Sequence, residues 1–90
     1  MAAAPETTFE LLVRRLPDGS HLLCVLNTDP DHATEGEIAM RGSFAHVLDI
    51  DLPTAVSVPA RVEDGWTRFR TMLDPGGTAF FLLKDAADKR

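Results

Sequence analysis

The chain has 90 residues, which is enough for one domain and too few for two. Hydrophobic residues make up 44% of the sequence, a content that is typical of globular proteins and argues against disorder. Nine basic and fourteen acidic residues give a net charge of −5, which argues against nucleic acid and anionic membranes as partners, because both require clustered Lys and Arg.

The N-terminal part of the sequence predicts a β-hairpin after a flexible lead-in. Residues 1–8 are mainly Ala, Thr, Pro and Glu, a composition typical of a fraying tail. Residues 9–16 predict a strand, and Pro-Asp-Gly-Ser at 17–20 predicts a turn, because Pro fixes φ and Gly accepts a positive φ. Residues 21–27 predict the return strand, whose apolar run is typical of a strand buried on both faces or central to a sandwich. Within it, Cys24 is expected to be a small buried hydrophobic residue.

The middle of the sequence predicts two further strands, at residues 33–40 and 44–50. In the first of them, Ile38 and Met40 fall on the same face. Strict alternation in the second places one set of side chains on a common face, namely Phe44, His46, Leu48 and Ile50.

The C-terminal part predicts three more strands with clear turns between them. Residues 55–62 predict an edge strand, because Pro59 interrupts them and proline cannot donate a hydrogen bond to a neighbouring strand. Glu-Asp-Gly at 63–65 predicts a hairpin turn into residues 66–73, which alternate well. Residues 78–84 predict the closing strand.

About seven to eight short strands, punctuated by Gly and Pro, predict an all-β fold, an antiparallel β-sandwich. The sandwich is expected to span residues 9–84, with a C-terminal tail at 85–90. Its core is expected to contain the apolar residues that alternate in phase, which are Leu11, Val13, Leu23, Val25, Ile38, Phe44, Leu48, Val58, Phe69, Leu73, Phe81 and Leu83.

No residue pattern predicts a catalytic centre, a cofactor or a metal site. The histidines and Cys24 lack the spacing of zinc ligands, and no serine lies in a Gly-x-Ser-x-Gly elbow. Asp29, Asp31 and His32 form one polar cluster able to hold a hard cation, although a solvated loop is the more common setting for such a cluster. We therefore expect a protein that is not an enzyme. Without a signal-peptide pattern or a long apolar run, it is expected to be soluble and cytoplasmic.

Trp66 is the candidate for ligand binding. It follows a hairpin turn and is flanked by Asp64 and Arg68, so the three residues form a candidate glycan site. An aromatic ring suits the apolar face of a pyranose, but a lone Trp in a small sandwich more often packs in the core or at a domain interface.

Three segments of the chain share features with one known family. They read HLLCVLN at 21–27, FAHVLDI at 44–50 and GWTRFRTMLDPGGTAFFLLK at 65–84. Together they resemble the C-terminal β-sandwich domain of glycoside hydrolases with a (β/α)₈ catalytic barrel, of the α-amylase and β-galactosidase types. The matching positions are packing and turn residues: Val47, Leu48, Asp49, Phe69, Leu73, Pro75, Gly76 and Phe81.

This resemblance implies an accessory domain without catalytic residues, because the catalytic carboxylates of such enzymes lie on the barrel. Its partner would be the catalytic domain or chain of a carbohydrate-active enzyme, or a second copy in a homodimer. Edge strands near Pro59 and the apolar surface of residues 22–26 are candidate dimer contacts. The alternative is a stand-alone carbohydrate-binding module that uses Trp66.

Overall fold

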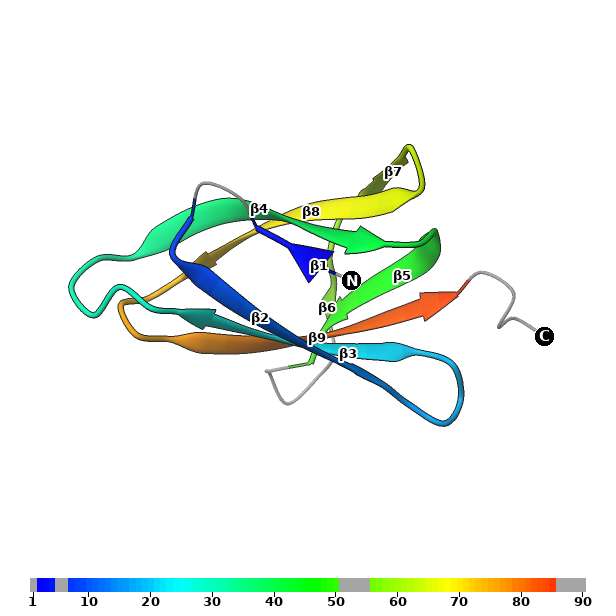
Figure 1. The fold of residues 1–90 in the computed structure, drawn as a ribbon, viewed down its shortest axis with the longest axis horizontal. Helices are drawn as coiled ribbons and strands as arrows, with labels where there is room; N and C mark the ends of the chain where they lie inside the picture. Colours follow the sequence, from blue (N-terminus) through cyan, green and yellow to red (C-terminus); the bar gives the residue numbers. More distant parts are fainter. Residues whose placement is uncertain (1, 5–6, 51–55, 86–90) are drawn as a thin grey trace.

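The computed structural model describes residues 2–4, 7–50 and 56–85. Within these ranges the chain forms nine β-strands and no helix, and the strands make two antiparallel sheets that stack face to face (Figure 1). The predicted all-β sandwich is confirmed, with slightly more strands than the seven to eight expected. In the described part of the chain there is consequently no helix able to cross a membrane.

One sheet has four strands in the order β1-β4-β8-β7. These are β1 (Ala2–Ala3), β4 (Thr34–Arg41), β8 (Trp66–Leu73) and β7 (Arg61–Glu63). The antiparallel pair of β4 and β8 forms its centre, in a register that runs from Thr34 opposite Leu73 to Arg41 opposite Trp66. The short β1, which the sequence did not predict, lies within the expected lead-in and pairs with β4.

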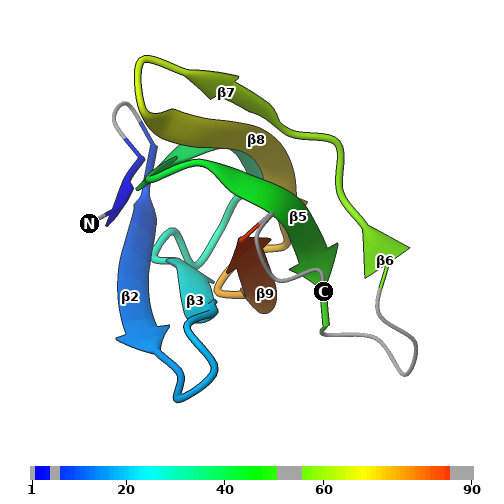
Figure 2. The same cartoon turned by 90° about the vertical axis from the view of Figure 1, so that its right-hand side faces the viewer.

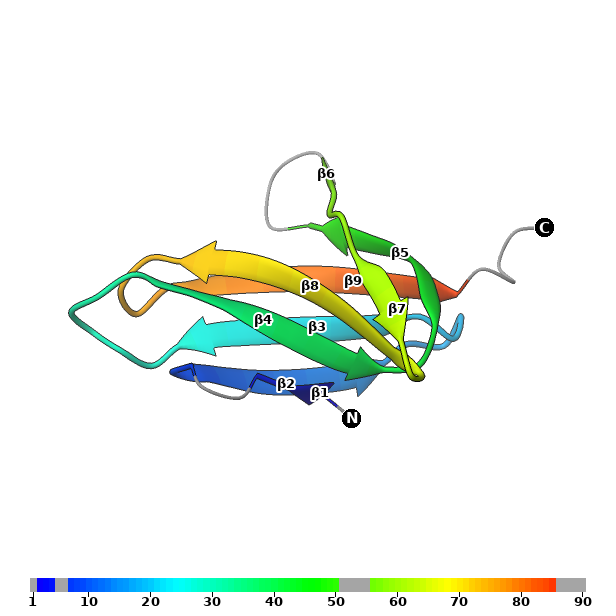
Figure 3. The same ribbon diagram turned by 90° about the horizontal axis from the view of Figure 1, so that it is seen from above.

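The other sheet has five strands in the order β2-β3-β9-β5-β6. These are β2 (Phe9–Arg15), β3 (His21–Asn27), β9 (Thr78–Asp85), β5 (Phe44–Asp49) and β6 (Val56–Ser57). The predicted hairpin of β2 and β3 is confirmed, and the C-terminal strand β9 inserts between β3 and β5. Figure 3 looks down on the stacked sheets and shows β2 along one edge and β6 at the opposite edge.

Among the described strands the chain passes from one sheet to the other at several connections, one before β5 and one after β6 among them. The predicted strand at 55–62 is in fact two strands, because Pro59 interrupts it: β6 belongs to the five-stranded sheet and β7 to the four-stranded sheet (Figure 2). Residue 55 lies outside the described residues. The crossing from β4 to β5 is held by the buried Thr67, whose Oγ1 donates to the carbonyl of Gly42 at 2.7 Å and accepts from the N–H of Phe44 at 3.0 Å.

The hydrophobic core lies between the sheets. Phe69 of β8 and Phe81 of β9 meet edge to face at its centre, with ring centroids 5.0 Å apart. The sequence prediction is confirmed for the buried residues Leu23, Val25, Ile38, Phe44, Phe69, Leu73, Phe81 and Leu83. Three other predicted core residues are half-buried and pack against its margin, namely Leu11, Val13 and Val58.

Two sequence predictions of burial are wrong. In β5 the register shifts between Phe44 and His46, so Val47 rather than Leu48 faces the core. A β-bulge adds one residue and thereby inverts the alternation that follows it. Cys24 is half-buried on the outer side of β3, because the inward positions of this strand belong to its odd-numbered residues.

Asn27 ties the loops together at one end of the sandwich. The side chain is fully buried, and its Nδ2 donates to the carbonyls of His32 at 2.9 Å and Asp74 at 3.1 Å. Its Oδ1 accepts from Thr8 Oγ1 at 2.6 Å and from the N–H of Asp29 at 3.1 Å. One amide thereby satisfies polar groups from three separate segments of the chain.

Candidate functional site

The three residues of the predicted glycan site gather at one end of the four-stranded sheet. Alternation in β8 turns Trp66 and Arg68 outward and buries Thr67 and Phe69. Asp64 precedes them in the turn between β7 and β8, where Asp64 and Gly65 have φ values of 54° and 81°. Positive φ at both central residues is the geometry of a two-residue hairpin turn, as the sequence predicted.

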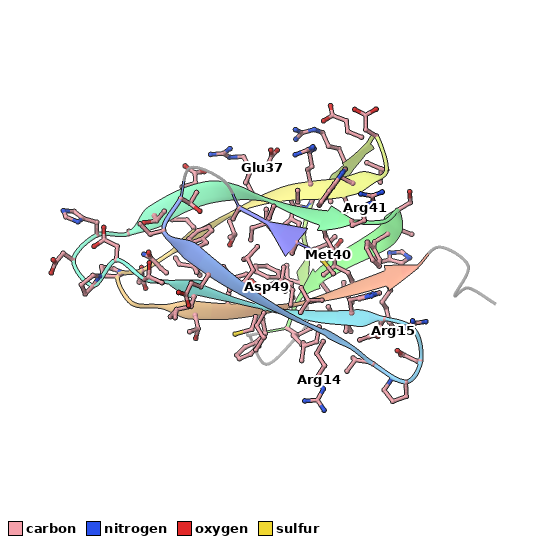
Figure 4. All side chains as sticks on the ribbon, in the orientation of Figure 1. Arg14, Arg15, Glu37, Met40, Arg41 and Asp49 are labelled. Atoms are coloured by element: carbon pink, nitrogen blue, oxygen red, sulfur yellow. The ribbon has the colours of Figure 1, made fainter. Side chains whose placement is uncertain are left out.

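An ion-pair network covers the outer side of this sheet beside Trp66. Arg61 donates to Glu37 at 2.8 Å, and the Glu37 hydrogen bond and charge raise the pKa of this guanidinium. Arg68 lies between two carboxylates, with Nη1 3.7 Å from Glu37 and Nε 3.4 Å from Glu63, the latter an ion pair without hydrogen-bond geometry. Figure 4 shows Glu37 pointing away from the sandwich on this side. The network links β4, β8 and β7, so Arg68 already has anionic partners.

Trp66 also has a neighbour on its ring. The guanidinium carbon of Arg41 lies 5.5 Å from the ring centroid, within the range of a cation–π contact. The indole is half-buried on the sheet surface and is not part of the core. A sugar that stacks on Trp66 must therefore displace Arg41 or use the opposite face of the ring.

The predicted polar cluster at Asp29, Asp31 and His32 lies in a loop whose members hydrogen-bond to one another. The carboxylate of Asp29 accepts from the N–H of Asp31 at 2.9 Å and of His32 at 3.2 Å, and the His32 ring lies 3.2 Å from it. The bond from Asp31 is the largest cause of a lowered pKa at Asp29. Among the residues that the structure describes, no group of three or more His, Cys, Asp and Glu side chains is placed to hold a metal ion.

A second surface lies on the outer side of the five-stranded sheet, and we call it the outer apolar face. It consists of Leu12, Leu22, Cys24, Leu26, Leu48, Phe80 and Leu82. The strand registers place these residues side by side in rows, because Cys24 is opposite both Leu12 and Phe80. Leu12 is 71% exposed and Phe80 is 37% exposed, and the other members are half-buried. The two outer sides of the sandwich therefore differ: one is charged and the other is apolar.

No protein-family model and no curated protein matches this chain. The likeness of residues 21–27, 44–50 and 65–84 to the C-terminal domains of glycoside hydrolases stays a hypothesis.

The sequence alone did not show the extent of the outer apolar face. Its signal is present, because β3 and β9 carry apolar residues at consecutive positions and not only at alternate ones. Such runs are typical of strands covered on both faces. In the described residues the core covers only the inner side of this sheet.

Proposed function

We propose that this protein is a non-catalytic interaction domain that packs its outer apolar face against the catalytic domain of a carbohydrate-active enzyme. The observation that carries the proposal is the contiguous apolar surface on the five-stranded sheet, which includes the exposed Leu12 and Phe80. Monomeric soluble proteins rarely expose large contiguous apolar patches, and those that do commonly use them to bind partners.

The resemblance to glycoside hydrolase C-terminal domains supplies the class of partner. Such a domain binds by packing side chains and needs no reactive group of its own. The face offers aliphatic side chains and one aromatic ring, with Glu10 and Arg14 at its β2 margin to form a polar rim. An apolar centre with a polar rim is the usual anatomy of a protein–protein interface.

The proposal is tested by titrating the domain into a purified α-amylase-type (β/α)₈ catalytic domain from which its own C-terminal sandwich has been removed. Phe80→Glu should weaken binding by about 10-fold or more, because it places a charge in the centre of an apolar contact. Met72→Glu is the matched control, since Met72 is 66% exposed on the outer side of the other sheet.

Protection of Cys24 from a maleimide in the mixture would locate the contact on this face. Absence of binding by the native domain to a panel of such catalytic domains would contradict the proposed class of partner. Equal losses in the Phe80 and Met72 variants would contradict the proposed surface.

A carbohydrate-binding module is the second candidate, and the half-exposed Trp66 among polar side chains favours it. An affinity-gel screen against soluble and insoluble glycans tests it, with Trp66→Ala as the negative control. Arg41→Ala should strengthen binding if the sugar uses the ring face that Arg41 now covers. Lack of retention on every glycan would contradict this candidate and leave the first one unaffected.

A further inference from the structure

The edge strand β2 differs from the other strands that end the two sheets. Among the described residues, β1 and β6 have two residues each and β7 has three, whereas β2 has seven. Its pairing with β3 is unbroken from Phe9 to Arg15, and it contains no bulge, proline or glycine. Natural sheets usually protect long edges with such interruptions, because an open edge invites another strand.

The free side of β2 presents backbone hydrogen-bonding groups. Hydrogen bonds to the β3 side are made at even-numbered positions, since the Thr8 carbonyl accepts from Thr28 at 2.9 Å and the Leu16 N–H donates to Ser20 at 2.8 Å. Successive residues of a strand direct these groups to opposite sides. The N–H and C=O groups of Leu11 and Val13 therefore point to the side where no described strand pairs with β2. Figure 1 views the molecule from this side, with β2 in front.

We propose that β2 pairs antiparallel with β2 of a second copy of this chain, around a twofold axis at Leu12. The free backbone groups lie on odd-numbered residues, so odd-numbered residues of the two copies must be opposite each other. Leu11 then pairs with Val13 of the second copy, and Val13 pairs with Leu11 of the second copy. This register leaves Leu12 opposite Leu12 in a pair without hydrogen bonds, where opposing side chains approach most closely.

The side chains on the outer side of β2 favour this register. Glu10, Leu12 and Arg14 read acidic, apolar, basic along the strand, and all three are exposed. An antiparallel copy reads basic, apolar, acidic, so Glu10 meets Arg14 of the second copy at both ends of the contact. Shifting the axis to Leu11 would place Glu10 against Leu12, and shifting it to Val13 would place Arg14 against Leu12. Figure 4 shows Arg14 pointing away from the sandwich.

The pairing joins two five-stranded sheets into one continuous sheet. The two outer apolar faces then become one surface across the twofold axis, because Leu12 belongs to both the edge and the face. The inference does not depend on the proposed function, since a dimer through β2 leaves most of the outer apolar face open to a partner of any class.

Charge reversal tests this pairing by analytical ultracentrifugation at low salt. Glu10→Arg alone places Arg opposite Arg, and Arg14→Glu alone places Glu opposite Glu, so each variant should dimerise about 10-fold or more weakly than the native chain. An equimolar mixture of the two variants should recover the dimer, because every pair across the axis is then complementary. Arg70→Glu, on the outer side of the other sheet, is the matched control and should leave dimerisation unchanged.

Hydrogen exchange gives a second readout. Protection of the Leu11 and Val13 amides should rise with protein concentration, whereas the amides of Leu12 and Arg14, which face β3, should stay protected throughout. A native chain that remains monomeric into the millimolar range would overturn the proposal, as would a variant mixture that dimerises no better than its components. A dimer that is lost in Phe80→Glu but kept in Glu10→Arg would assign self-association to the outer apolar face instead.

Discussion

The buried amide of Asn27 shows how much a single polar side chain can contribute at the end of a small sandwich. Replacing it with Ala leaves the carbonyls of His32 and Asp74 without their donor and the N–H of Asp29 without its acceptor. These three groups are part-buried, so each one left unpaired costs about 1 kcal/mol, and we expect Asn27→Ala to lower the free energy of unfolding by about 3 kcal/mol. Urea unfolding measures this loss.

Thr28→Ala is the control for this prediction, because Thr28 makes its side-chain hydrogen bond in an exposed position. It should lower the free energy of unfolding by less than about 1 kcal/mol. If Asn27→Ala were as stable as the native chain, the loops would not depend on this amide.

Two loop carboxylates make the free energy of unfolding depend on pH in the acidic range. Hydrogen bonds from the side chain and backbone of Ser20 lower the pKa of Asp18, and the N–H of Asp31 lowers that of Asp29, both from an ordinary 3.8. A lowered pKa in the folded state means that the charged form stabilises the fold above the ordinary pKa, and that this contribution is lost as pH falls through the folded pKa. We therefore expect the urea concentration at the midpoint of unfolding to decrease once the pH is below about 4.

Asp29→Asn should make this acid-dependent fall shallower, because one of the two titrating groups is removed. Asp18 is exposed and Asp29 only half-buried, so the change is expected to be small and is best measured as a difference in slope between pH 5 and pH 2.5, the span in which perturbed Asp residues titrate. An unchanged slope would show that the Asp29 hydrogen bonds do not persist in solution.

At the scale of elements, the crossing from β4 to β5 depends on Gly42. Its φ of +120° is a conformation that other residues rarely adopt, and a Cβ added there would lie 3.0 Å from the ring of Phe44. We expect Gly42→Ala to lower the free energy of unfolding by about 2–3 kcal/mol, from backbone strain and crowding together.

Gly19 separates these two causes. Its φ is +91°, and a Cβ added there would meet nothing within 4 Å, so Gly19→Ala introduces strain alone. Thermal unfolding should therefore rank Gly42→Ala as the less stable variant. The opposite order would show that the ring of Phe44 moves aside.

The strand β9 gives the sharpest test of which side of the five-stranded sheet is the core. Phe81 is 1% exposed, whereas its neighbour Phe80 is 37% exposed on the outer apolar face. Phe81→Ala should cost about 3–5 kcal/mol. Phe80→Ala should cost about 1 kcal/mol or less, because little buried volume is removed. Similar losses in both variants would mean that the outer apolar face is covered in solution.

Local chemistry explains which elements the sequence could predict. The Asp64-Gly65 turn and the alternation in β8 depend on residues adjacent in the chain, and both predictions are confirmed. The register shift in β5 depends on a bulge in its pairing with β9, and the sequence of β5 carries no local signal for this bulge. The split at Pro59 was predicted as an interruption, but the change of sheet that follows depends on which distant strand offers a partner.

At the scale of the whole molecule, the candidate surfaces were less predictable than the fold. The ion pairs beside Trp66 join side chains from three strands, and the register that brings Arg61 to Glu37 is not readable from spacing. The apolar run in residues 21–27 predicts a strand buried on both faces or central to a sandwich, and residues 79–83 form a second apolar run. Sequence alone cannot say whether the second cover comes from the same chain or from a partner.

The position of β9 has a consequence for how the chain folds as it is synthesised. This C-terminal strand lies inside its sheet, between β3 and β5, so neither strand has its central partner until residues 78–85 have left the ribosome. Until then the nascent chain carries a β2–β3 hairpin with an open apolar side, a state prone to association with other chains. Folding must wait for this late, long-range closure, which is expected to be slow compared with the hairpin itself.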